Sequence, residues 1–313
     1  MKYIKELTDG DRVFDIYLCK TKTSAVTKNG KAYESVTLQD KTGSIDAKIW
    51  EPNNPGIAEF EAMDYIEVYG DVTSFNGALQ VSIKRIRRCQ EGEYNQSDYF
   101  PVSSKDNDSM YQELLSLIQS IKDPYYKQLL QKLFVENQEF VKTFRYSSAA
   151  KAVHHGFIGG LLEHTLSVAK LCDYYAGAYP ILKRDLLLTA AICHDIGKTK
   201  ELAPFPINDY TDEGNFLGHI VIGTTMVGEV AAAIENFPKE QLTQLQHCIL
   251  AHHGKYEYGS PKLPSIIEAV ALNYADDTDA KMETFKEILE NNEDKTGWLG
   301  FSRLFETNVK ASK

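Results

Sequence analysis

Histidines and acidic residues recur in this chain on stretches that are otherwise apolar. Leu187, Ala190 and His194 fall at i, i+3 and i+7, the spacing of one face of an α-helix, so His194 continues a core-facing stripe. Asp195 follows it directly. An imidazole beside a carboxylate at a buried helix end is costly to desolvate unless a cation compensates. The pair therefore indicates a divalent metal site.

Four further candidate ligands lie within or beside apolar runs, and these are His164, His219, His252 and Asp276. Helical spacing places His164 on the apolar face of residues 161–168 and His252 on that of residues 245–252. His253 faces away from this second stripe. A single buried histidine is most often a hydrogen-bonded core residue. Several helices that each direct a ligand inward favour one shared metal site.

The sequence around these residues resembles the HD superfamily of metal-dependent phosphohydrolases over residues 145–285. The resemblance rests on the order of His164, His194, Asp195, His219, His252 and Asp276, which is the pattern of the two-metal branch. It implies that Asp195 bridges two ions. The remaining ligands would be His164, His194 and Asp276 at one ion, and His219 and His252 at the other.

Lys198 lies one turn beyond His194 and is no ligand while it is protonated. The resemblance implies that it contacts a phosphate oxygen, and the alternative is a cap at a helix C-terminus. The role of His253 is left open: it could bind the metal, contact a metal ligand from outside, or contact a phosphate. The spacing gives no reason to make His154 or His155 a ligand. Two cations about 3.5–4 Å apart lower the pKa of a bridging water and neutralise a phosphoryl transition state. Asp195 and Lys198 are therefore the predicted catalytic residues.

Residues 1–90 alternate apolar and polar side chains over five stretches, as β-strands do. The expected strands are 13–19, 33–38, 44–50, 65–72 and 79–86, and a short helix is expected at 57–63. Five strands with a helix between the third and the fourth are typical of the OB-fold barrel. The segment 36–50 is similar to nucleic-acid-binding OB domains.

Aromatic and basic side chains of this barrel are candidates for binding a single strand. The candidate base-stacking residues are Tyr33, Trp50 and Phe75. For Trp50 the barrel core is the favoured location. The basic residues that are candidates to follow a phosphate backbone are Lys28, Lys31, Lys48, Lys84, Arg85, Arg87 and Arg88. Their alternative is a role as solvated charges at the barrel edge.

The pattern changes after residue 90 and again near residue 109. Residues 91–108 are polar and rich in breakers, which is typical of a linker. Residues 109–313 follow helical periodicity and end in a short apolar tail. Within them, residues 204–217 form a polar loop that is either a lid or an ordinary surface loop. The predicted fold class is multidomain α and β, an N-terminal five-stranded OB-fold β-barrel followed by an all-α HD-type helical domain.

Composition sets the expected compartment and partners. The net charge of −10 argues against nucleic acid, but it falls on residues 91–313, because residues 1–90 carry 13 basic and 13 acidic side chains. No run approaches the ~18 apolar residues of a membrane span. Residues 1–6 lack the apolar core of a signal peptide. The five cysteines form no CxxC pair, which favours reduced thiols in a cytoplasmic protein over a thiolate metal site.

The order of an OB-fold before an HD domain, in 313 residues, is similar to the bacterial YhaM-type 3'-5' exoribonucleases. This resemblance implies Mn²⁺-stimulated removal of nucleotides from the 3' end of single-stranded RNA, with some action on single-stranded DNA. The ligand types alone suit Mn²⁺, Fe²⁺, Co²⁺, Ni²⁺ or Zn²⁺ rather than Ca²⁺. One alternative is an HD phosphohydrolase of free nucleotides whose OB-fold serves regulation or assembly into a homo-oligomer. Another is a nucleic-acid-binding replication factor with structural metals.

Overall fold

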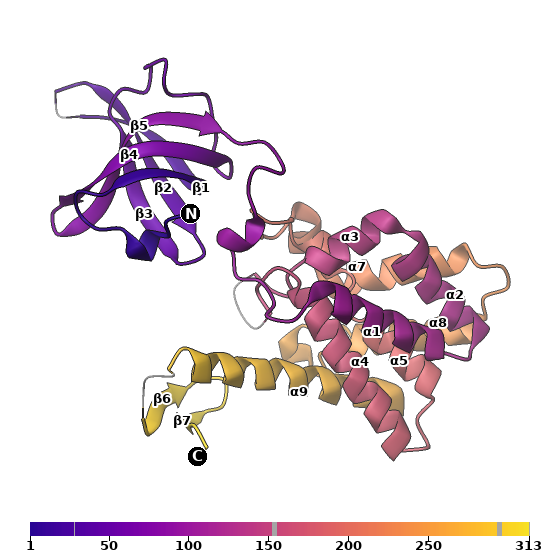
Figure 1. The fold of residues 1–313 in the computed structure, drawn as a ribbon. Coiled ribbons are helices and arrows are strands. Elements are labelled where there is room, and N and C mark those ends of the chain that lie inside the picture. Colours follow the sequence, from indigo (N-terminus) through magenta and orange to yellow (C-terminus); the bar gives the residue numbers. More distant parts are fainter. Residues whose placement is uncertain (28, 152–154, 293–295, 313) are drawn as a thin grey trace. The chain divides into compact units, whose positions relative to one another are not determined.

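The computed structural model describes residues 1–313 apart from 28, 152–154, 293–295 and 313. The chain divides into two compact units, Met1–Val102 and Ser103–Lys313 (Figure 1). The division falls inside the stretch 91–108 that the sequence marks as a linker. None of the described helices combines the length and apolarity needed to cross a membrane.

The first unit is a closed five-stranded barrel. Its strands are β1 (Arg12–Val26), β2 (Ala32–Asp40), β3 (Gly43–Ile49), β4 (Tyr65–Phe75) and β5 (Ala78–Arg88). They pair in the order β1-β2-β3-β5-β4, and β4 pairs back onto β1 to close the barrel. Among the pairings of these five strands in the described residues, the short β3–β5 pairing is parallel and the others are antiparallel. In β2, every second residue from Val36 to Asp40 is buried, as at Val36 and Leu38. This arrangement confirms the predicted OB-type barrel.

The prediction of a short helix at 57–63 is wrong, because this connection between β3 and β4 consists of turns and extended chain. Ile57 forms a parallel bridge with Ile86 on β5. Phe60 is buried in the barrel core, and Lys22 donates a hydrogen bond to its carbonyl oxygen. Short helices are marginal by themselves, so backbone pairing and burial of an aromatic ring outweigh helical propensity here.

The chain beyond β5 still packs on the barrel. Tyr94 stacks on Tyr65 with ring centroids 3.6 Å apart, and Tyr99 meets Tyr65 edge-on at 4.8 Å. The buried Tyr99 also donates a hydrogen bond to the carbonyl oxygen of Ile16. The first part of the polar stretch is therefore fixed to the barrel by aromatic contacts.

The second unit is a helical bundle that ends in a β-hairpin (Figure 1). Its helices are α1 (Asn107–Ser120), α2 (Pro124–Gln131), α3 (Gln138–Tyr146), α4 (Gly160–Ala178), α5 (Arg184–Cys193), α6 (Lys198–Glu201), α7 (Asp212–Ala232), α8 (Lys239–Ala251) and α9 (Ile267–Glu290). The tail forms strands β6 (Trp298–Ser302) and β7 (Thr307–Lys310). The helical prediction is confirmed, and the hairpin is an addition that the sequence did not indicate.

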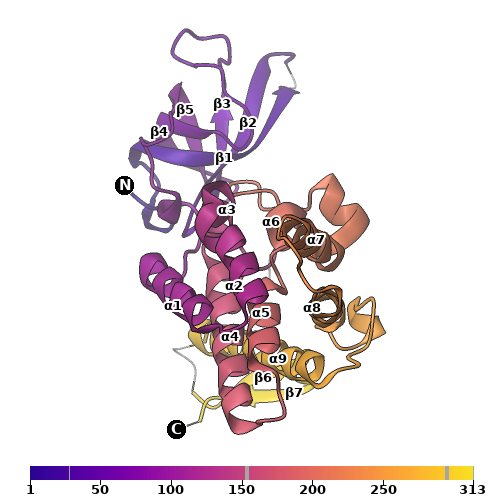
Figure 2. The same cartoon turned by 90° about the vertical axis from the view of Figure 1, so that its right-hand side faces the viewer.

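Helix α5 lies at the centre of this bundle and positions the HD pair. It packs against α4, α8 and α9 (Figure 2), and all of its residues from Leu186 to Cys193 are buried. Apolar contacts of Leu161 on α4 and Leu272 on α9 complete the same core. The C-terminal end of α5 therefore meets three other helices at one point in the interior.

Candidate metal centre

The first ligand group joins α4, α5 and α9. His164 Nε2 lies 3.2 Å from His194 Nε2 and 3.1 Å from Asp276 Oδ1. Asp195 Oδ2 is 3.5 Å from each of the two imidazole Nε2 atoms. His194 Nδ1 donates to the carbonyl oxygen of Ala191, which turns its Nε2 toward the group. The predicted residues therefore converge, and the group has the donor set of a divalent cation site.

The carboxylate of Asp279, behind the first ligand group, orients His164. Its Nδ1 lies 2.7 Å from Asp279 Oδ2, which also contacts His155 Nε2 at 3.0 Å. Burial disfavours the protonated ring, but hydrogen bonds to Asp276 and Asp279 outweigh it and raise the pKa of His164 to about 10. A cation bound at this group would therefore displace the proton on Nε2 of His164. A carboxylate behind a histidine in this way is the usual support of a metal ligand. Spacing gave no sign of this role for His155.

The second ligand group lies on the other oxygen of Asp195. His219 Nε2 is 3.4 Å and His252 Nε2 is 3.7 Å from Asp195 Oδ1. All three of these atoms are buried and have no hydrogen-bond partner in the described chain. Burial lowers the pKa of His252 well below its usual range, so its ring is neutral and able to bind a metal. Buried polar atoms without partners are costly, and a cation between them would satisfy all three.

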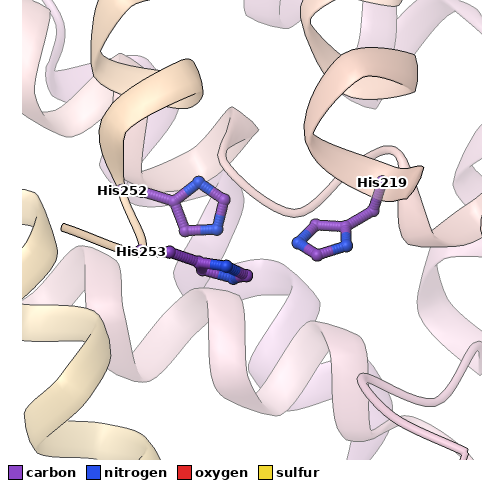
Figure 3. A group of neighbouring side chains, drawn as sticks. All are labelled: His219, His252 and His253. Atoms are coloured by element: carbon purple, nitrogen blue, oxygen red, sulfur yellow. The ribbon is translucent and has the colours of Figure 1, made fainter. Parts of the chain in front are cut away.

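His253 joins this second group, contrary to the expectation from helical phase. Figure 3 shows its ring beside those of His219 and His252, and ligand atoms of the three lie within 4.8 Å of one another. Helix α8 ends at Ala251, and the chain turns at Gly254 with a φ of 73°, so the phase of the helix no longer applies. His253 Nδ1 donates to the carbonyl oxygen of Tyr258, which leaves its Nε2 for the group.

Glu201 is a site residue that sequence reasoning missed. Its Oε1 accepts hydrogen bonds from both the backbone N–H and Nδ1 of His219, each at 2.9 Å. The backbone N–H is free for this contact because α7 is kinked at Gly218, where φ is 71°. Glu201 thereby fixes the tautomer of His219 with Nε2 toward Asp195. The one feature of the sequence that could have indicated Glu201 as a site residue was its position seven residues after His194.

Lys198 points at the shared carboxylate. Its Nζ lies 2.8 Å from Asp195 Oδ2. Burial disfavours the ammonium, but the charge of Asp195 outweighs this and raises the pKa of Lys198. Lys198 is the first residue of α6, and within the described residues its ammonium group pairs with the Asp195 carboxylate. The side chain is therefore a fixed positive charge at the edge of the ligand groups.

Both ligand groups open into one cavity of about 520 Å³. His164, Asp195, Lys198, His219, His253 and Asp276 contribute to its wall. Tyr210 lines it too, so the loop 204–217, for which a lid and an ordinary surface loop were both expected, borders the cavity. Such a concave site with several ionisable groups on its wall is the expected form of an active site.

Comparison with known proteins agrees with this geometry. The family model of the HD domain matches residues 161–281. A 3'-5' exoribonuclease YhaM of Geobacillus sp. (strain WCH70) is 37% identical over 285 residues, which cover 90% of this chain and 86% of that protein. The chain belongs to the YhaM family of 3'-5' exoribonucleases. Among solved structures, the second OB-fold domain of replication protein A from Methanococcus maripaludis matches at 25% identity and a TM-score of 0.22, over 30% of this chain and all of that one.

Two of the aromatic candidates of this YhaM-family barrel, Trp50 and Phe75, are exposed, and Tyr33 is half-buried. Tyr33 and Trp50 form a tilted ring pair with centroids 5.2 Å apart. The expected core location of Trp50 is wrong, since 43% of this residue is exposed. It follows Ile49, the last residue of β3, and continues the strand's alternation, in which Asp46 and Lys48 also face outward. Phe75, at the β4–β5 turn, is 61% exposed.

Most of the basic candidates have acidic partners. Lys84 pairs with Asp71, Arg87 with Glu67 and Glu93, and Arg88 with Asp64. Lys31 pairs with Glu51, and Lys48 donates a hydrogen bond to Ser35. Arg85 has no ion pair within the described part of the chain. Lys28 and His154 lie outside the described residues.

The two adjacent histidines should differ in their effect on metal content. His252→Ala is expected to lower the content toward one ion per chain, because His252 Nε2 is fully buried and faces Asp195. His253→Ala should lower it less. Elemental analysis of the purified variants measures this. His247→Ala, on α8 just before the two histidines, is the matched control, since its Nε2 accepts a hydrogen bond from the backbone N–H of Ser265 outside the group. A larger loss in His253→Ala would reverse the assignment.

Proposed function

We propose that this chain is a 3'-5' exoribonuclease that hydrolyses phosphodiester bonds of single-stranded RNA, and of single-stranded DNA as a secondary substrate. Two divalent cations per chain would assist, with Mn²⁺ as the expected metal. The observation that carries the proposal is the position of Asp195, whose two oxygens face separate ligand groups. Three buried atoms without hydrogen-bond partners supply the second group.

The chain's own residues have distinct tasks in this proposal. Bound cations would supply a water of lowered pKa and positive charge at the phosphoryl group. Lys198, held by Asp195, adds a further positive charge for a non-bridging phosphate oxygen. Asp279 and Glu201 keep the rings of His164 and His219 in the tautomers that expose Nε2. All of these groups are preorganised before a substrate arrives.

Degradation of labelled RNA tests the proposed activity. Purified protein is incubated with Mn²⁺ and single-stranded RNA that carries a label at its 5' end. A ladder of successively shorter labelled products is the expected result, and a block at the 3' end should prevent it. Cleavage of free nucleotides alone would support the nucleotide phosphohydrolase instead. Binding without cleavage would support the replication factor.

The barrel is proposed to hold the single strand through two aromatic residues, the half-buried Tyr33 and the exposed Phe75. Tyr33→Ala and Phe75→Ala should each weaken binding of a long single-stranded RNA by about 1–3 kcal/mol, the contribution of one stacked base. A fluorescence anisotropy titration measures the affinity, and light scattering measures the mass. Phe14→Ala is the matched control, because Phe14 is an exposed aromatic on another strand. Unchanged affinity with a changed mass would favour self-association as the task of the barrel.

A further inference from the structure

Three tyrosines that are not metal ligands line the cavity of the ligand groups. Tyr210 precedes α7, Tyr258 ends the 3₁₀ turn Tyr256–Tyr258, and Tyr274 lies on α9. They are 48%, 59% and 62% exposed, respectively. Separate chain segments thus bring three aromatic rings to one wall, and each ring keeps a large accessible area. An accessible ring beside a phosphodiester-cleaving site can stack on a base.

A lysine accompanies each of these rings. Lys151 Nζ lies 5.9 Å from the ring centroid of Tyr210, and Lys255 Nζ lies 5.1 Å from that of Tyr258. On α9, Lys281 follows Tyr274 at i+7, the same helix face, and also lines the cavity. The cavity therefore combines aromatic rings with ammonium groups, which is the composition of surfaces that bind single-stranded nucleic acid.

Each of these lysines forms an ion pair with an exposed carboxylate. Asp209, Glu257 and Asp277 are the carboxylates that pair with Lys151, Lys255 and Lys281, at 2.6, 3.5 and 2.7 Å. Every one of these six side chains is at least two-fifths exposed. Exposed ion pairs contribute little to stability, so a phosphate can replace the carboxylate at low cost. The lysines are thus available to a nucleic-acid backbone.

On the basis of the exoribonuclease function above, we propose that Tyr210, Tyr258 and Tyr274 form a base-stacking subsite for the 3'-terminal nucleotides of a single strand. Lys151, Lys255 and Lys281 contact the phosphates of the same nucleotides. Stacking on rings accepts every base, so the subsite holds the strand end without reading its sequence. This grip belongs to the helical unit and is separate from that of the barrel.

RNA strands with and without bases at the two 3'-terminal nucleotides test the subsite. Both RNAs present the same upstream nucleotides to the barrel. The ratio of kcat/KM, or of affinity, between the two RNAs therefore reports only on contacts with the 3'-terminal bases. For the wild type, the intact strand should be favoured by about 5- to 150-fold for each missing base, in kcat/KM with Mn²⁺ and in affinity without metal. Each Tyr→Ala variant should move this ratio toward one. Each Tyr→Phe variant should keep it, because the ring rather than the hydroxyl stacks.

Tyr174→Ala is the matched control, because this tyrosine is 70% exposed on α4 and lies outside the cavity wall. It should keep the wild-type ratio. An unchanged ratio in all three cavity alanine variants would overturn the subsite, and so would an equal loss in the phenylalanine variants. Absence of RNA cleavage by the wild type would instead overturn the exoribonuclease proposal. The metal-free binding ratio would still test the subsite in that case.

Discussion

Asp195→Asn is expected to lower phosphodiester hydrolysis at least about a thousandfold, which corresponds to roughly 4 kcal/mol of transition-state stabilisation. Among the described residues, Asp195 alone faces both ligand groups, with Oδ2 toward His164 and Oδ1 toward His219. Asparagine keeps the shape but loses the charge that two cations would share. Initial rates on single-stranded RNA measure the effect, and elemental analysis should show lost metal.

Single-strand binding should survive this substitution, because the barrel is a separate compact unit. Lys198 loses its buried partner, so thermal unfolding should be recorded to show that the variant is folded. Asp212→Ala is the control, since this carboxylate is exposed in the first turn of α7. Wild-type turnover by a metal-loaded Asp195→Asn enzyme would contradict the bridging role.

Gly197→Ala should both destabilise the fold and disturb the site. A Cβ at this position would lie 2.0 Å from the carbonyl oxygen of His219 and 2.7 Å from the backbone nitrogen of Gly223. Both neighbours are backbone atoms, so α6 and α7 must separate. The free energy of unfolding should fall by about 1–3 kcal/mol or more. His219 should also move away from Asp195.

Urea denaturation and metal analysis measure these two effects. The matched control is Gly177→Ala on α4, where a Cβ meets no atom within 4 Å. Alanine favours a helix over glycine, so this control should gain up to about 1 kcal/mol. Gly197→Ala with wild-type stability and metal content would show that the packing of α6 on α7 does not position His219.

The ligands on helix faces could be predicted because helical periodicity extends to them. His164 and His194 continue apolar stripes, and both are buried as expected. His253 escaped the same reasoning, since α8 ends two residues earlier. Glu201 contacts His219, and His155 contacts Asp279, across separate segments of the chain. Such contacts depend on tertiary packing, which a single sequence does not encode as a local pattern.

The barrel shows the same division between local and tertiary causes. Its five strands follow from alternation, and the observed strands contain the expected ones except for Trp50, one residue beyond β3. The connection at 57–63 was mispredicted because the burial of Phe60 overrides local preference. The core location expected for Trp50 was wrong because Ile45, Ala47 and Ile49 occupy the inward positions of β3. The same alternation places Trp50 on the outward face.

The ion pairs along β5 affect how strongly salt would weaken the binding of single-stranded RNA to the barrel. Binding to nucleic acid weakens with salt because each phosphate that meets a free cationic group releases condensed counterions, with a slope of about −0.7 per contact for single strands. Lys84, Arg87 and Arg88 already have carboxylate partners. An RNA phosphate that binds one of these side chains therefore replaces a carboxylate of the protein, so one anion is exchanged for another. Arg85 then provides most of the counterion release at this edge. The barrel should therefore hold RNA by stacking, with an affinity that changes little across ionic strength.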